Sequence, residues 1–190
     1  MLNFMAGRQN LPGQAAEMNI GDTLKDLLLV DLNGNEQVKT LSGTKLLFVF
    51  SITCTACALN FDNWREIDTS IDKNLILYLS LDSLTSTTQY AVEKGIADRT
   101  FLLKNPQDQI RLKLARVPQT ILVRDGKIEI ISVGRLNKDK KDTIINTVNS
   151  HLGNSQVVEG SVGVSGILAS CDRLKPHFLR GQKTKQSQPS

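Results

Sequence analysis

The amino-acid sequence predicts an α/β protein in which a central mixed sheet carries helices on both faces and starts with an N-terminal β-hairpin. Residues 46–50 and 75–79 form two apolar runs without polar alternation, which is typical of strands buried on both faces. Each run is followed by apolar residues at helical spacing. This alternation indicates parallel strands joined by crossover helices.

The hairpin is predicted ahead of these two strands. The apolar residues Leu28, Leu29, Val30 and Leu32 precede Asn33-Gly34, a dipeptide that favours a two-residue hairpin turn. A second short run then ends at Leu41. The pattern indicates two antiparallel strands before residue 46.

A helix is predicted after the strand at 46–50. It opens near Cys54, and its buried face is formed by apolar residues at helical spacing, namely Cys57, Phe61, Trp64 and Ile67. Trp64 is accordingly predicted to lie in the core rather than to bind a substrate.

Two further helices are predicted in the middle of the chain. The first starts from the Ser/Thr-rich stretch at 83–88 and runs through Ile96. The second is short and covers residues 108–114, with Ile110 and Leu114 expected on one face.

The C-terminal part is predicted to hold a second hairpin and a last helix. Strands at 120–123 and 128–133 flank an Asp-Gly turn at 125–126. Asn137 can cap the helix that follows. The buried face of that helix carries three apolar residues, Ile144, Ile145 and Val148.

The 190 residues are predicted to form one domain at residues 20–152. Residues 1–19 are predicted to be an N-terminal extension or membrane-proximal linker, and residues 153–190 a flexible basic tail. The net charge of +4 is mild and its basic excess lies in that tail, which argues against a nucleic-acid partner. No run approaches the roughly 18 apolar residues of a membrane span.

Cys54 and Cys57 are the residues that point most directly to a reaction. They are two of three cysteines, and they lie between a buried strand and the start of a helix. Because a helix N-terminus stabilises a thiolate, Cys54 is the predicted nucleophile. Cys57 lies about one helical turn further on and is the predicted resolving thiol. This exchange needs no cofactor and no metal.

Two other interpretations of the cysteines stay open at this point. Both can be buried structural residues, because free cysteine often behaves as a small apolar side chain. Alternatively, the pair can bind zinc together with Cys171 and either His151 or His177, although these lie far along the chain. A solvated histidine is the simpler expectation at both histidine positions.

Val117 and Pro118 form the second predicted part of the site. Pro118 lies just ahead of the strand at 120–123 and has no backbone N–H. A cis bond between the two residues would leave the Val117 backbone free to pair with an extended substrate. The two residues are therefore predicted to bind substrate, the alternative being a proline that merely starts a strand.

These features occur in the order found in thioredoxin-like proteins. A dithiol follows a buried strand, a Val-Pro-Gln-Thr step lies at 117–120, a hairpin turn at 125–127, and a Val-Gly step at 133–134 ahead of the last helix. Over residues 20–152 the chain resembles this superfamily. The N-terminal hairpin and the helix around Tyr90 resemble its extracytoplasmic branch, the membrane-anchored disulfide reductases of cytochrome c maturation and methylamine utilisation.

The resemblance implies a monomeric protein disulfide oxidoreductase that works as a reductase without a cofactor. It also implies protein disulfide or dithiol substrates, an electron-donor redox protein, and a place on the extracytoplasmic side of a bacterial membrane. Residues 7–9 are similar to the segment after the membrane anchor in methylamine-utilisation disulfide proteins, which implies a missing anchor ahead of them. No signal peptide is recognisable, so a cytoplasmic location stays open.

The chain departs from the family pattern around the dithiol. Thr55 and Ala56 replace the usual Gly-Pro or x-Pro, and Phe48 stands where thioredoxin has a buried Asp, so no general base is identified. In peroxiredoxins a Pro and a Thr precede the peroxidatic cysteine, and Leu47 and Ser51 occupy those places here. A peroxiredoxin-type thiol peroxidase and a non-catalytic binding module are the alternative functions.

Overall fold

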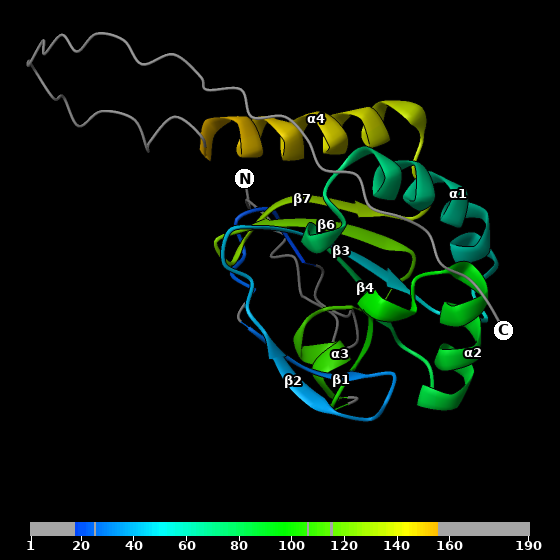
Figure 1. Ribbon diagram of the computed structural model, residues 1–190. Coiled ribbons are helices and arrows are strands. Elements are labelled where there is room, and N and C mark those ends of the chain that lie inside the picture. The colour runs from blue at the N-terminus through cyan, green and yellow to red at the C-terminus, as the bar shows by residue number, and fades with distance from the viewer. Residues whose placement is uncertain (1–17, 25, 106, 115, 156–190) are drawn as a thin grey trace, which may run out of the picture. The chain divides into compact units, whose positions relative to one another are not determined.

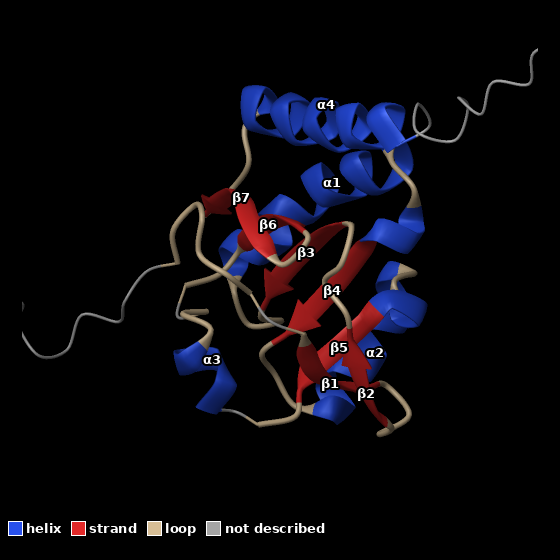
Figure 2. Cartoon of the chain, turned by 90° about the vertical axis from the view of Figure 1, so that its left-hand side faces the viewer, coloured by secondary structure: helices blue, strands red, loops and turns tan. Residues whose placement is uncertain are grey.

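The computed structural model describes residues 18–155 apart from positions 25, 106 and 115. In this part of the chain a seven-stranded sheet has the order β2-β1-β5-β4-β3-β6-β7 (Figure 1; β5 is labelled in Figure 2). Its strands are β1 (Leu27–Asp31), β2 (Glu36–Lys39), β3 (Thr44–Phe50), β4 (Ile76–Ser80), β5 (Thr100–Leu103), β6 (Gln119–Arg124) and β7 (Lys127–Val133). The α-helices are α1 (Thr55–Ser70), α2 (Leu84–Lys94), α3 (Gln107–Arg111) and α4 (Lys138–Ser155), and two 3₁₀ turns are η1 (Lys73–Leu75) and η2 (Ala97–Arg99).

Strands β3 and β4 occupy the middle of the sheet and run parallel, as predicted. Leu46 pairs with Ile76, and Phe50 pairs with Ser80. The β4–β5 pair is parallel as well, whereas the other neighbouring pairs are antiparallel, so the sheet is mixed.

Both faces of the sheet are covered. On β3, Leu46, Phe48 and Phe50 face a core shared with α1, α2 and α4, whereas Leu47 and Val49 face a second core. The segment after α3 and the segment ahead of β1 close this second core. Figure 2 shows α1 and α4 on one side of the sheet and α3 on the other. The predicted arrangement, with helices on both faces, is confirmed.

The predicted N-terminal hairpin is present, formed by β1 and β2. Gly34 lies in its turn with φ +85°, a conformation that glycine adopts without strain. The hairpin joins the rest of the sheet through β5, a strand that the sequence analysis did not predict. β5 has only four residues, too few to give a clear strand pattern.

Two helix predictions in the middle of the chain were wrong in extent. α2 stops at its C-cap Gly95, which adopts a left-handed conformation with φ +70°, so Ile96 lies beyond the helix. α3 is shorter than predicted, and Ile110 is 73% exposed whereas Leu114 is buried, so the two do not share a face. Apolar spacing over one or two turns is too short to define a helix face.

The last hairpin and the last helix match their predictions. β6 and β7 pair around the turn at 125–126. Asn137 Oδ1 accepts a 3.0 Å hydrogen bond from the backbone N–H of Lys140 and so caps the start of α4. Ile144 and Val148 are buried against the sheet.

His151 near the end of α4 is not solvated, contrary to expectation. Its Nε2 lies 3.2 Å from a carboxylate oxygen of Glu129 on β7, and its side chain is 11% exposed. Its Nδ1 lies 3.3 Å from the hydroxyl of Thr44 on β3. These contacts attach the last helix to two strands, and they depend on tertiary structure that the sequence pattern does not show.

Trp64 attaches α1 to the sheet. Its ring stacks on that of Phe48 with centroids 5.1 Å apart, and its Nε1 donates a 2.8 Å hydrogen bond to the hydroxyl of Thr120 on β6. Trp64 is 1% exposed, so the predicted core role is confirmed. One side chain therefore links α1 to both β3 and β6.

Trp64→Phe is expected to lower the free energy of unfolding by about 2 to 4 kcal/mol, because it removes core volume and takes the donor away from Thr120. Urea unfolding followed by circular dichroism measures this loss. Leu59→Ala in the same helix is the control, since Leu59 is 56% exposed and a surface change costs under about 0.5 kcal/mol. Equal losses in the two variants would contradict the role given to Trp64.

Candidate active site

Cys54 is the N-cap residue of α1. Its backbone is extended, with φ −85° and ψ 109°, and the backbone N–H of Cys57 donates to its Sγ at 3.3 Å. The turn before it is closed by a hydrogen bond from the Cys54 N–H to the Ser51 carbonyl oxygen at 3.2 Å. Cys54 is partly exposed. Its sulfur therefore lies at the positive end of the helix and within reach of a partner.

Cys57 lies inside the domain and is 2% exposed. Burial raises the pKa of its thiol from an ordinary value of 9.0 to about 12. A hydrogen bond from the Ser51 backbone opposes this rise, whereas the Cys54 sulfur and the Asp82 carboxylate add to it. Cys57 is therefore a protonated thiol at neutral pH.

The Val117–Pro118 peptide bond is cis. The Cys54 thiol donates to the Val117 carbonyl oxygen at 3.7 Å, and the Pro118 carbonyl oxygen accepts a 2.8 Å hydrogen bond from the Gly134 N–H. The structure thus brings the predicted residues Cys54, Cys57, Val117 and Pro118 together at the start of α1.

Asp82 is a site residue that the sequence analysis missed. Its carboxylate accepts hydrogen bonds from the Ile52 backbone N–H at 2.7 Å and from the Ser51 hydroxyl at 3.1 Å. It lies two residues after the end of β4, and the carboxyl ends of the parallel strands β3 and β4 lie side by side. A carboxylate just beyond a predicted parallel strand is the signal that could have identified it, since sites form at such strand ends.

Aromatic rings lie in the same core as Cys57. The ring of Tyr90 on α2 lies 5.6 Å from that of Phe50 and 6.2 Å from that of Phe61, between centroids. Burial raises the pKa of Tyr90, and charge on Cys57 adds to this rise, so the phenol stays protonated. The sequence pattern predicts a helix at Tyr90 but no role for this side chain at the site.

Two asparagines of α1 bind the loop between β7 and α4. Asn60, one turn after Cys57, is completely buried, and its Oδ1 accepts hydrogen bonds from the Leu136 N–H at 2.8 Å and from Asn63 Nδ2 at 3.1 Å. Asn63 Nδ2 also donates to the Leu136 carbonyl oxygen at 3.1 Å. Sequence reasoning missed these contacts because polar residues on an amphipathic helix are expected to face water.

No group of three or more His, Cys, Asp or Glu side chains within the described residues is arranged to hold a metal ion. Of the zinc ligands considered above, Cys171 and His177 lie outside those residues, and His151 contacts Glu129. The dithiol has instead one accessible sulfur at a helix N-terminus and a buried thiol one turn away. Such an arrangement suits nucleophilic attack followed by disulfide exchange.

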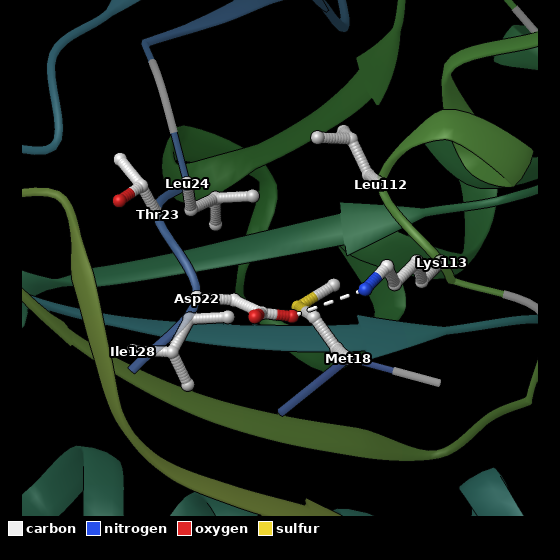
Figure 3. A pocket seen from close by; sticks show the side chains of 7 residues that line it. All are labelled: Met18, Asp22, Thr23, Leu24, Leu112, Lys113 and Ile128. Carbon is white, nitrogen blue, oxygen red and sulfur yellow. Dashed lines mark hydrogen bonds and ion pairs between the residues drawn. The ribbon is translucent and has the colours of Figure 1, made fainter. Parts of the chain in front are cut away.

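A small pocket of about 220 Å³ is lined by residues other than those of the predicted site (Figure 3). The segment ahead of β1, Leu112, Lys113 and Ile128 line it. Within it, Lys113 Nζ lies 3.1 Å from a carboxylate oxygen of Asp22. Its lining includes neither cysteine and neither residue of the cis bond, so we do not assign the active site to it.

No protein-family model matches the chain, and no curated protein matches it. Among solved structures, the thioredoxin domain of a thiol-disulfide oxidoreductase from Bacteroides vulgatus is similar, with 19% identity, a TM-score of 0.57, and 70% of this chain and 100% of that chain covered. A thiol:disulfide interchange protein from Bacteroides sp. has 19% identity and a TM-score of 0.56, and the match covers 70% of this chain and 91% of that chain. A peroxiredoxin-like protein from Aquifex aeolicus has 12% identity and a TM-score of 0.57, with 72% and 89% covered.

At identities below 20%, these likenesses concern the fold. They agree with the mixed sheet described above. The fold that the sequence resemblance implied is confirmed, and the chain has the thioredoxin-like fold.

Proposed function

We propose that the chain is a thiol-disulfide oxidoreductase that exchanges disulfides with protein substrates through Cys54 and Cys57 and works as a reductase. The observation that carries this proposal is the difference between the two sulfurs. Cys54 is partly exposed at the N-terminus of α1, whereas Cys57 is buried and has a raised pKa. One sulfur is therefore suited to attack a substrate and the other to resolve the product.

In the proposed reaction, the Cys54 thiolate attacks one sulfur of a substrate disulfide. A bond forms between Cys54 and that sulfur as the substrate disulfide breaks, and the departing substrate thiolate takes up a proton. Cys57 then loses its proton and attacks Cys54, which forms the intramolecular disulfide and releases the second substrate thiol. The substrate gains two electrons and two protons, and an electron-donor redox protein later reduces the Cys54–Cys57 disulfide.

Val117 and Pro118 are the proposed substrate-binding residues. The Val117 carbonyl oxygen lies 3.7 Å from the Cys54 sulfur, so a peptide paired with this backbone would carry its disulfide next to the nucleophile. Pro118 has no backbone N–H that would compete with the substrate peptide for a hydrogen-bond acceptor.

We further propose a monomer on the extracytoplasmic side of a bacterial membrane, following the sequence resemblance. In this proposal residues 20–152 are the catalytic domain, residues 1–19 a membrane-proximal linker and residues 153–190 a basic tail. Within the part of the chain that the structure describes, no helix has both the length and the apolar character needed to cross a membrane.

A thiol peroxidase is a second candidate, because a peroxiredoxin-like structure is among the similar ones. Leu47 and Ser51 occupy the places of the Pro and Thr that peroxiredoxins use, and the Ser51 hydroxyl already donates to Asp82. A resolving thiol one turn from the nucleophile also suits a dithiol exchange. These features favour the oxidoreductase.

Equilibration with a dithiothreitol or glutathione redox series, followed by thiol alkylation, tests the proposed function. We expect Cys54 and Cys57 to titrate together as one two-electron couple with a low potential, where about 30 mV corresponds to 1.4 kcal/mol. A high potential would indicate an oxidase. If the two thiols never form a disulfide with each other, a binding module is the correct function, and rapid turnover of hydrogen peroxide would indicate a peroxidase.

Cys57→Ser is expected to accumulate mixed disulfides between Cys54 and its protein partners, because attack is intact but resolution is lost. Mass spectrometry of the trapped species identifies the partners. Cys54→Ser is the matched control and should trap nothing comparable at the dithiol, since Cys57 is buried. Equal trapping by both variants would show that the roles given to the two sulfurs are wrong.

Cys57 in the Cys54→Ser variant should react with iodoacetamide only at strongly alkaline pH, with a midpoint well above 9.0, because burial raises its pKa. Below pH 9.0 the thiol is protonated in folded and unfolded chains alike. Above it the unfolded chain loses the proton first, so the free energy of unfolding should fall with rising pH. The same variant in urea should give a midpoint near 9.0, and an identical midpoint in the folded protein would contradict the burial argument.

A further inference from the structure

A series of hydrogen bonds links the dithiol helix to the loop that carries Pro118. Asn60 on α1 accepts a hydrogen bond from the Leu136 N–H at 2.8 Å, and the Gly134 N–H donates to the Pro118 carbonyl oxygen at 2.8 Å. The residue before Pro118 accepts a hydrogen bond from the Cys54 thiol at 3.7 Å. The contacts form a closed ring from α1, through residues 134–136 and the cis bond, back to the start of α1.

Asn60 is an unusual residue to bury at this position of α1. It is 0% exposed, and its Nδ2 has no hydrogen-bond partner within the described residues. Burying an unpaired amide group costs free energy, so an apolar residue would fill this position more favourably unless the polar group were needed. The acceptor that Asn60 provides for Leu136 is the contact that an apolar side chain cannot replace.

We infer that Asn60 is a positioning residue, which holds the loop at 134–136 against α1 and thereby sets where the substrate-binding residues 117–118 lie relative to Cys54. The inference rests on the proposed function, since it takes 117–118 to bind substrate. Disulfide exchange requires the attacking sulfur and the bound disulfide to be held in a narrow range of geometry. Without Asn60, the Leu136 N–H loses its acceptor, and the hydrogen bond from Asn63 Nδ2 to the Leu136 carbonyl oxygen is the side-chain tie to the dithiol helix that remains.

Asn60→Leu keeps the approximate size of the side chain and removes the acceptor. With insulin as the disulfide probe and dithiothreitol as the electron donor, we expect KM for insulin to rise about tenfold. The rate at which iodoacetamide alkylates Cys54 should stay the same, because this small reagent does not bind at 117–118. A raised KM with an unchanged alkylation rate distinguishes a loss of substrate positioning from a change in the reactivity of the Cys54 thiol.

Two further variants control for a loss of stability. Asn60→Asp keeps an oxygen acceptor for the Leu136 N–H and should retain a KM near that of the wild type. Asp68 lies on α1, as Asn60 does, but away from the loop, and its carboxylate pairs with Arg99 on η2. Asp68→Asn removes this charge and should lower the unfolding temperature without changing KM for insulin. A rise in KM for Asp68→Asn equal to that for Asn60→Leu would overturn the inference, as would an unchanged KM in Asn60→Leu.

Hydrogen–deuterium exchange at the Gly134 amide tests the same link without a substrate. This amide donates to Pro118, at the far end of the loop from Asn60. We expect faster exchange in Asn60→Leu than in Asp68→Asn, and equal exchange would overturn the inference. If the wild-type protein reduces neither insulin nor glutathione disulfide, the proposed function fails, and exchange at Gly134 still decides whether Asn60 holds the loop.

Discussion

Burial of β3 on both faces determines where the two sulfurs lie. Alternate side chains of this strand fill two separate cores, so β3 is held in the middle of the sheet. The chain leaves β3 at Phe50, and hydrogen bonds from Ser51 and Ile52 to Asp82 hold the turn that follows. The start of α1, and with it Cys54, is thereby fixed at the carboxyl end of the parallel strands.

The electrostatics of the site differ from those expected from the thioredoxin pattern. Phe48 is packed between the rings of Trp64 and Tyr78, so the strand position of the usual buried Asp is apolar here. The carboxylate that acts on Cys57 comes instead from Asp82, beyond the end of β4. Because this carboxylate also binds the turn ahead of Cys54, one residue contributes both to the shape of the site and to its charge.

The features predicted correctly from the sequence depend on local patterns. Continuous apolar runs indicated β3 and β4, the Asn33-Gly34 dipeptide indicated the first hairpin, and the spacing of Cys54 and Cys57 after a buried strand indicated the dithiol. The features that were missed depend on contacts between distant segments. Asn60 has the appearance of a surface residue in the sequence, and its partner Leu136 lies 76 positions away. β5 is likewise too short to have a pattern of its own, and its pairing with β1 and β4 defines it.

Trp64 is the single tryptophan of the chain. It lies two helical turns after Cys57 on the buried face of α1, in contact with Phe48 and hydrogen-bonded to Thr120. Its indole is therefore shielded from water in one defined environment, at the base of the helix whose first residues carry out the proposed exchange. The protein thus contains an intrinsic fluorophore whose emission originates from this one place in the fold, without a label.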